Sequence, residues 1–382
     1  MKSLLIATLL VSLNAVAGGE LVKLVRTPEG GLQPQALINA GGVLHLIYLK
    51  GDPKACDVFY ARRAAGGTNF SRPLRVNSEP GAAIAVGTIR GAQLALGRSG
   101  RLHVAWNGVT SKQSPRGAPM LYARLNDAGD AFEPQRDVST STQNLDGGGS
   151  IAADDAGHVY VLWHAASVQG PQGEQNRAVF LAPSDDDGKT FAAERKVNPD
   201  KTGACACCGV KAFADARGNL AVLYRAAGGG MDRDVTLLLS TNRARTFQSA
   251  VLGAWRIGTC PMSSMSLTSG GGGTLLAAWE AQGQVFHSLL QPGQLEPGDP
   301  AMPSGATKGR KHPVTVAGGP DNSRVLTAWT EGTGWQKGGA LAWELADRAT
   351  GRTTTGRTEG AIPVWGRITA VAEADGSFTI FH

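Results

Sequence analysis

SDDDGKTF, residues 184–191, is the stretch that decides how this sequence folds. It predicts a tight turn between two β-strands, because Asp186 can accept hydrogen bonds from neighbouring backbone N–H groups and Gly188 can adopt a positive φ. Phe191 can then pack under the turn. A single turn of this kind indicates only one β-hairpin, so its recurrence along the chain carries more information than its presence.

Weaker copies of the stretch lie at 63–70 (RAAGGTNF), 125–132 (LNDAGDAF) and 240–247 (STNRARTF). All four stretches end in phenylalanine: Phe70, Phe132, Phe191 and Phe247. These phenylalanines are 62, 59 and 56 residues apart (132−70, 191−132 and 247−191). A repeat of that length, with one hairpin corner in each unit, predicts four-stranded β units arranged as a β-propeller.

The second strand of each unit is marked by an aromatic residue at its end. The six aromatic residues are Tyr48, Trp106, Trp163, Tyr224, Trp279 and Trp329. We expect these large, flat side chains to pack between neighbouring units. The first strands of the units start near residues 35, 92, 149, 208, 261 and 312.

The two ends of the chain supply the last unit. Residues 367–381 contain another first and second strand, and residues 20–25 can add a strand that closes the ring and leaves no free sheet edge. Counted in this way, the all-β fold has seven blades. Six blades is the alternative if the fifth unit, which has no clear fourth strand or corner, is degenerate.

Residues 1–17 have the features of a secretory signal peptide. Lys2 supplies the positive charge, residues 4–13 are apolar, and Ala15-Val16-Ala17 fits the small-residue cleavage rule. The apolar run is too short to span a bilayer, and no later stretch is long and apolar enough to do so. We therefore expect cleavage after about Ala17, a periplasmic or secreted location, and one propeller domain over residues 18–382.

The composition is that of a globular chain rich in turns. It has 52 glycines among 382 residues and is 42% hydrophobic, which suits an all-β fold. The formal net charge is +6, or +5 once Lys2 is removed with the leader (6−1). Because the basic residues are scattered, the sequence indicates no nucleic-acid surface and only a mild preference for anionic ligands. We expect a monomer.

The corner at 184–191 and its spacing over roughly 35–252 resemble the Asp-box, or BNR, repeats of the sialidase superfamily. The likeness extends to uncharacterised exported proteins labelled exo-sialidase. It implies a propeller of four-stranded blades with a glycan site. True sialidases are expected to carry an early Phe/Tyr-Arg-Ile-Pro motif, three arginines, an Asp acid/base and a Tyr–Glu nucleophile pair. Here Thr88-Ile89-Arg90-Gly91 offers the arginine without Ile-Pro, and the nucleophile pair has no counterpart.

Strand geometry predicts which end of the propeller carries the chemistry. Loops before first strands and loops after second strands share one end, which we call the axial face; the corners lie at the other end, the corner face. The polar, thiol and aromatic residues of those two loop classes are Arg90, Asn107, Asp146, His164, Cys205, Cys207, Cys208, Arg225, Cys260, Met262, Glu280, Arg310, Lys311, His312, Glu331, Trp335 and Trp365. Their concentration at one end favours the axial face as the ligand site.

The charged residues of this set suggest recognition and hydrolysis of an anionic ligand. Arg90, Arg225 and Arg310 come from three blades and could bind a carboxylate or sulfate; alternatively each pairs with Asp146, Glu280 or Glu331 to stabilise the rim. Asp146 and Glu280 could form an acid/base pair if a glycan binds.

The remaining residues of the set add further contacts to a sugar. Trp335 and Trp365 could stack on sugar rings, and Asn107 and His164 could bind substrate. His312, beside two cationic residues, should have a lowered pKa if those charges are close.

The cysteines admit three interpretations. The first is a disulfide between neighbouring blades, with Cys207 or Cys208 joined to Cys260. The second is a soft-metal site for copper or zinc built from two or three of Cys205, Cys207, Cys208 and Cys260, to which Met262, His164 or His312 could add a ligand. The third is a redox-active disulfide. Cys56, far from the others, is expected to be a buried, inert thiol.

These observations lead to three hypotheses for the function. The first is an exported propeller that binds or hydrolyses an anionic glycan at the axial face. The second is a non-hydrolytic propeller with a cysteine-based copper, zinc or redox site. The third is an interaction scaffold.

Overall fold

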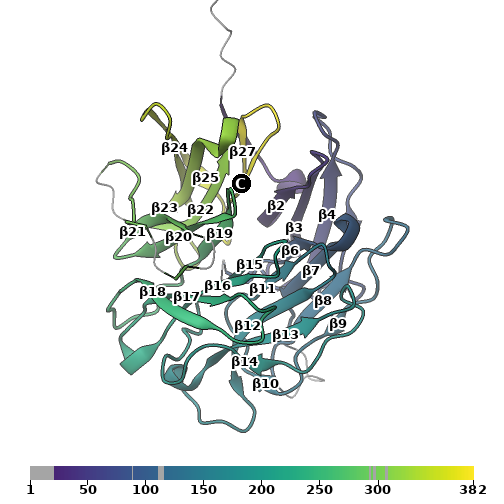
Figure 1. Cartoon of the computed structure of the whole chain (residues 1–382). Helices are drawn as coiled ribbons and strands as arrows, with labels where there is room; N and C mark the ends of the chain where they lie inside the picture. Colours follow the sequence, from purple (N-terminus) through teal and green to yellow (C-terminus); the bar gives the residue numbers. More distant parts are fainter. Residues whose placement is uncertain (1–20, 88, 111–115, 292–293, 296–297, 306–308) are drawn as a thin grey trace, which may run out of the picture.

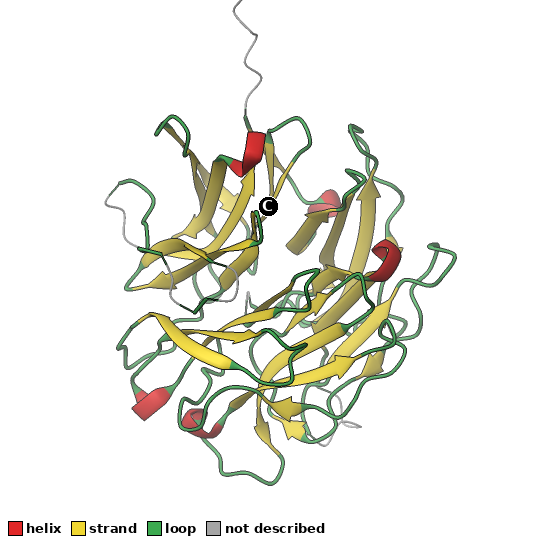
Figure 2. Cartoon of the chain, in the orientation of Figure 1, coloured by secondary structure: helices red, strands yellow, loops and turns green. Residues whose placement is uncertain are grey.

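The computed structural model describes residues 21–87, 89–110, 116–291, 294–295, 298–305 and 309–382; the predicted leader, residues 1–17, lies outside them. Seven β-sheets follow one another along the chain and surround a central axis (Figure 1). The helices of the described residues are five 3-10 turns of three residues each (Figure 2). The fold is a seven-bladed β-propeller, as the repeat predicts, and the six-bladed alternative is excluded.

The strands of each blade pair antiparallel, apart from β1 in the seventh blade, and the first strand lies nearest the axis. Five blades have four strands or more. The first blade comprises β2 (Leu32–Ile38), β3 (Leu44–Asp52), β4 (Ala55–Arg63) and β5 (Leu74–Arg75), and the second comprises β6 (Gln93–Leu96), β7 (Leu102–Asn107), β8 (Met120–Arg124) and β9 (Arg136–Asp137). The third comprises β11 (Ser150–Ala153), β12 (Val159–Ser167), β13 (Ala178–Ser184) and β14 (Arg195–Lys196), with β10 (Thr142–Gln143) paired to β12; the fourth comprises β15 (Lys211–Ala214), β16 (Leu220–Arg225), β17 (Val235–Ser240) and β18 (Gln248–Gly253); and the sixth comprises β22 (Arg310–Gly318), β23 (Arg324–Glu331), β24 (Gly339–Asp347) and β25 (Thr353–Ile362).

The fifth and seventh blades have three described strands each. The fifth comprises β19 (Met265–Gly271), β20 (Thr274–Ala281) and β21 (Gln284–Leu290). The seventh comprises β26 (Thr369–Ala372), β27 (Phe378–Phe381) and β1 (Val22–Val25).

The N-terminal strand closes the ring. β1 pairs with β27 in parallel, with Val22 opposite Phe378 and Val25 opposite Phe381. The predicted closure of the last blade by the start of the chain is therefore confirmed. Both chain ends therefore sit in one sheet, in which β1 is the third strand from the axis.

The first strands line an axial channel. Contacts run from β2 to β6, β11, β15, β19, β22, β26 and back to β2. The channel encloses a cavity of about 450 Å³ to which all seven first strands contribute, among them Leu37, Leu94, Ile151, Phe213, Leu267 and Val316. The core between blades holds the second-strand aromatics: Tyr48, Trp106, Trp163, Tyr224, Trp279 and Trp329 are all buried, as predicted.

The corner at 184–191 has the predicted geometry. The backbone N–H of Thr190 donates to Asp186 Oδ1 (2.8 Å) and the Thr190 hydroxyl donates to Asp186 Oδ2 (2.6 Å). Gly188 has a φ of 73°, which suits a residue without Cβ. Phe191 packs edge-on against Tyr122 of the second blade, with ring centroids 4.8 Å apart. The corner therefore fastens the third blade to the second.

Candidate functional site

The axial face is held together by a repeated contact between blades. In three blades the polar residue directly after the second-strand aromatic bonds to the loop that precedes the next blade. Asn107 donates to the Gly147 carbonyl (2.6 Å) and accepts from the Gly149 N–H (3.2 Å). His164 Nε2 donates to the Cys208 carbonyl (2.7 Å), which fixes the tautomer because a carbonyl can only accept. Burial and the Arg177 charge lower the pKa of His164 to about 3, so the ring is neutral.

Arg225 makes the third such contact. Its Nε donates to the Ser263 hydroxyl (2.8 Å), and its two other nitrogens donate to the main-chain carbonyls of Arg233 (2.5 Å) and Glu280 (2.6 Å). The guanidinium also lies 5.0 Å from the Trp255 ring. Arg225 is thus fully buried and already bonded to neutral acceptors.

Glu280 departs from the series. It is the last but one residue of β20 and is 1% exposed, yet among the described residues no donor reaches its Oε2 atom. Burial raises the pKa of Glu280 to about 8, while the charges of Lys311 and Arg225 oppose the rise. The carboxyl is therefore neutral at pH 7. A buried oxygen without a hydrogen-bond partner lowers the free energy of unfolding and therefore calls for an explanation.

Asp146 is the second carboxyl group of the site. It lies in the loop before β11, has a side chain that is 47% exposed, and forms an ion pair with Arg90 from the loop before β6. A Cβ on the next residue, Gly147, would collide with His164 and with the Cys208 carbonyl. The Asp146 loop therefore packs directly on the cysteine loop.

The sixth blade places Arg310 and His312 at the first strand. Arg310 donates to the carbonyls of Pro303 (2.9 Å), Ser304 (2.6 Å) and Gly305 (3.1 Å), and its Nε lies 4.0 Å from Glu331. The buried His312 shares a hydrogen bond with the Ser264 hydroxyl (3.2 Å).

The predicted pKa shift of His312 is confirmed in direction. Burial lowers its pKa first, and the charges of Arg367 and Lys311 lower it further.

Lys211 crosses the axis beneath these loops. Its Nζ donates to Gln93 (2.8 Å) and Gln35 (3.2 Å), which belong to the first strands of the second and first blades. Burial, with the nearby Arg367, lowers the pKa of Lys211 to about 8. Lys211 and Gln35 line the end of the axial channel that lies nearest the axial face.

Trp335 is an exposed aromatic residue at the axial face. It lies in the loop between β23 and β24 and is 59% exposed. Its ring meets that of the buried Trp365 edge-on, with centroids 4.8 Å apart. The buried Trp365 therefore supports Trp335, which stays more than half exposed.

Of the three interpretations of the cysteines, the structure contains the disulfide. Cys207 is bonded to Cys260, which joins the loops before the fourth and fifth blades. Cys205 and Cys208 are free and buried. The pKa of the Cys208 thiol is lowered: burial opposes this, but the Cys205 thiol and the Arg225 charge outweigh it. Cys56 is free and buried, and burial raises its pKa to about 12, as expected of an inert thiol.

The structure adds residues that the sequence did not indicate. Glu174 accepts from the Ala206 N–H (3.0 Å) and from Arg233 (2.6 Å), and so anchors the cysteine loop. Glu174 and Arg233 lie in loops between second and third strands, several residues beyond the aromatic residue that marks the strand. A search of those whole loops, rather than of their first position, would have found them.

Comparisons with known proteins agree on the fold. No family model and no curated protein sequence matches the chain. A solved protein of unknown function from Dyadobacter fermentans superposes with a TM-score of 0.53 at 16% identity, over 82% of this chain and 93% of that chain. An α-L-arabinanase of Penicillium chrysogenum, complexed with arabinobiose, gives 0.53 at 12%, over 84% and 94%.

A leech intramolecular trans-sialidase gives a TM-score of 0.48 at 8% identity, over 92% of this chain and 86% of that chain. The two superpositions with a TM-score of 0.53 show that the chain shares its β-propeller fold with these solved proteins. At these identities the comparisons describe architecture and leave the activity open. Among the described residues no helix is long and apolar enough to cross a membrane.

Proposed function

We propose that the axial face binds an anionic glycan and that Glu280 and Asp146 are the carboxyl groups that cleave it. The observation that carries the proposal is Glu280. In the series Asn107, His164, Arg225 and Glu280, it is the residue with a buried side-chain oxygen that lacks a partner among the described residues. A carboxyl group that is neutral at pH 7 is what a general acid needs in order to protonate a leaving-group oxygen.

Asp146 supplies the complementary carboxylate. Its ion pair with Arg90 and its half-exposed position suit a base or nucleophile that must meet water or substrate. In glycoside hydrolysis one carboxyl group acts as the acid and a second, ionised one acts on the sugar from the other side. In this assignment Glu280 protonates the glycosidic oxygen and Asp146 attacks or activates water.

Two further features support a glycan as the ligand. The exposed ring of Trp335 offers an apolar platform for the C–H face of a sugar ring. An arabinanase of this fold binds arabinobiose, which favours a sugar as the ligand class. Lys311 and Arg90 favour a sugar that carries an acid group. The Asp-box corners, the leader at 1–17 and the disulfide support an exported, sialidase-like protein.

The test is release of sugar by the purified protein from a panel of arabinan, sialylated and uronic-acid substrates. We expect Glu280→Gln and Asp146→Asn each to lower the rate by at least about 100-fold. Glu331→Gln is the matched control, since Glu331 is a buried glutamate at the end of the second strand of the next blade and already bonds to Trp329 (2.8 Å) and Arg357 (2.7 Å). No release from any substrate excludes hydrolysis, and release that survives both substitutions excludes these residues.

Binding is measured separately by calorimetry with arabinobiose, sialyllactose and a uronic-acid disaccharide. Trp335→Ala should weaken binding of the preferred sugar without changing the fold. Binding without turnover would limit the axial face to recognition. Equal binding by wild type and Trp335→Ala would remove Trp335 from the site.

A further inference from the structure

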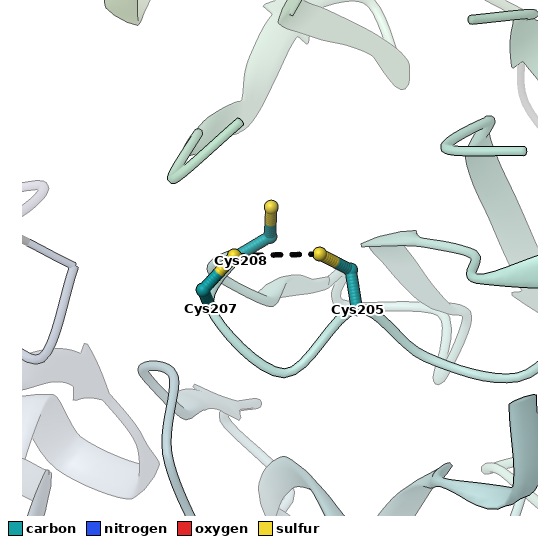
Figure 3. A group of neighbouring side chains, drawn as sticks. All are labelled: Cys205, Cys207 and Cys208. Carbon is teal, nitrogen blue, oxygen red and sulfur yellow. Dashed lines mark hydrogen bonds between the residues drawn. The ribbon is translucent and has the colours of Figure 1, made fainter. Parts of the chain in front are cut away.

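Four sulfur atoms from two neighbouring loops meet on the axial face. Cys205, Cys207 and Cys208 precede β15, and Cys260 precedes β19. The Sγ atom of Cys205 lies 3.5 Å from that of the disulfide-bonded Cys207. The Sγ atoms of Cys205, Cys207 and Cys208 all lie within 4.8 Å of one another (Figure 3). We call these three residues the sulfur triangle.

Backbone hydrogen bonds hold the sulfur triangle in place. The N–H of Cys205 donates to the Arg225 carbonyl on β16 (2.9 Å), and the N–H of Cys208 donates to the Cys205 carbonyl (3.4 Å). The His164 ring on β12 donates to the Cys208 carbonyl (2.7 Å). The loop is thus tied to the third and fourth blades, so its sulfurs are positioned before any ligand arrives.

A structural disulfide does not explain all of these cysteines. One disulfide needs two cysteines, and the Cys207–Cys260 bond alone closes the separation of 53 residues. Cys205 and Cys208 lie beside it, buried in a small cluster with Ala227. The free Cys56, in contrast, packs into the large apolar core of the first two blades. Cys56 fills space among carbon atoms, whereas Cys205 and Cys208 face other sulfurs.

We propose that reduction of the Cys207–Cys260 disulfide by a thiol converts the sulfur triangle into a binding site for one Cu(I) ion. Two thiol molecules supply two electrons and two protons to the S–S bond, which yields two cysteine thiols, and leave as their own disulfide. The three cysteines of the triangle then lose their protons to solvent as the ion binds. Cys260 remains outside the triangle and re-forms the disulfide when the ion leaves and an oxidant, such as a low-molecular-weight disulfide, accepts the two electrons.

The geometry and chemistry favour this ion. A metal–thiolate bond of about 2.3 Å places the sulfurs of one site about 4 Å apart, and the three separations are all 4.8 Å or less. Thiolates select soft cations such as Cu(I). Three sulfurs complete a trigonal Cu(I) site, while zinc requires a fourth ligand, which Cys260 or water would supply. Cys260 is exposed, so a thiol in solution can reach the disulfide.

The test is an anaerobic titration of the reduced, purified protein with Cu(I), supplied as its acetonitrile complex. Binding is followed by thiolate-to-copper charge-transfer absorbance and by competition with a chromophoric Cu(I) chelator. We expect one Cu(I) per chain in the reduced protein and none in the oxidised protein. Cys205→Ser and Cys208→Ser should each weaken binding by at least about 100-fold, with Cys56→Ser as the matched control that changes nothing.

Cys260→Ser keeps the test decisive. This variant cannot form the disulfide, so it should bind Cu(I) without prior reduction and as tightly as the reduced wild type. Failure of the reduced wild type to take up one Cu(I), or wild-type affinity in folded Cys205→Ser and Cys208→Ser, would overturn the proposal. So would stoichiometric Zn(II) binding that is accompanied by no Cu(I) uptake. None of these readouts involves a glycan, so they are independent of the proposed hydrolysis.

Discussion

Buried carboxyl groups at the two ends of the propeller differ in their partners and in their pKa. At the corner face Asp187 meets Arg101 at 2.5 Å, His103 at 3.4 Å and Arg124 at 3.9 Å. Burial raises the pKa of Asp187, but interactions with His103 and Arg101 outweigh it and lower the pKa overall. At the axial face Glu280 is more deeply buried, has no partner at Oε2 among the described residues, and has a pKa raised to about 8.

The difference separates a structural charge from a candidate functional one. Asp187 fastens one blade to the next through Arg101 and Arg124, and its Oδ1 atom, which has no hydrogen bond among the described residues, lies 3.4 Å from His103 Nε2. Glu280 occupies a position where three other blades place a residue that makes the same kind of fastening, yet no hydrogen bond from a described residue reaches its Oε2 atom. Unpaired, strongly shifted groups gather at active sites because catalysis needs them there, at a cost in stability.

Asp187→Asn should have the largest effect on stability. It removes the charged hydrogen bond from Arg101 while Arg101 keeps Asp127 and the buried Arg124 keeps Glu133, so we expect a loss of about 2–3 kcal/mol. Urea unfolding at pH 7 measures the loss. The control is Asp185→Asn in the same corner, whose side chain is 88% exposed and which should change stability by less than about 0.5 kcal/mol. Equal effects of the two substitutions would contradict a structural role for Asp187.

Glu280→Gln should make the protein more stable than wild type at high pH, whereas Asp187→Asn makes it less stable. The pKa of Glu280 is raised in the folded state, so wild type keeps its full stability below about pH 4.5 and loses part of it as pH rises through about 8. Glutamine removes that loss. We expect Glu280→Gln to exceed wild type in free energy of unfolding by on the order of 2 kcal/mol at pH 9 and to match it near pH 4.

Glu331→Gln is the control for that experiment. Burial raises the pKa of Glu331, but bonds from Arg357 and Trp329 outweigh it and lower the pKa. The glutamine variant should therefore be less stable than wild type at pH 7, and should approach it as pH falls below the usual range of a glutamate. A Glu280→Gln variant that behaved in the same way would show that Glu280 has a charge partner after all.

Lys211→Met tests the buried cation on the axis. Burial lowers the pKa of Lys211 to about 8, so the folded state favours the neutral amine. Wild type therefore has its full stability above about pH 10.5 and loses part of it as pH falls through about 8. The variant should show a stability difference between pH 10 and pH 7 that is smaller by about 1–2 kcal/mol. Lys196→Met, at a surface pair with Asp200, should leave the pH profile unchanged. An unchanged profile for Lys211→Met would mean that the axis is well hydrated.

Asp186→Asn should have the smallest effect. Hydrogen bonds from Thr190 and Ser184 outweigh burial and lower the pKa of Asp186 to about 2. The corner at 240–247 shows what asparagine does in this place: Asn242 accepts from the Thr246 N–H at 3.0 Å, much as Asp186 does from Thr190. The cost at pH 7 should be about 0.5–1 kcal/mol, measured by urea unfolding, and should vanish below pH 2. A cost as large as that of Asp187→Asn would contradict the division of roles within the corner.

The fold could be predicted because its signals are local. The corner at 184–191, the aromatic residue at the end of each second strand and the spacing of the repeats depend on neighbours in sequence. They placed the strands of all seven blades and the closure by β1. They also placed the candidate residues on one end of the propeller, because strand direction alone decides which loops share a face.

The chemistry of the axial face could not be predicted in the same way. Whether Arg225 meets a ligand or the carbonyls of Arg233 and Glu280 depends on how closely two blades approach each other. Lys211 reaches Gln93, 118 residues earlier in the chain, and no local pattern signals that contact. The missing partner of Glu280 is likewise a property of the assembled ring.

The protonation state of Glu280 is the most direct measure of the difference between the two faces. Infrared difference spectra of wild type minus Glu280→Gln, recorded from pH 4 to pH 10, isolate the signal of this one carboxyl group. We expect the C=O stretch of a protonated carboxylic acid at pH 6, replaced by carboxylate bands only as pH rises through about 8. Carboxylate bands already complete at pH 6 would contradict this expectation.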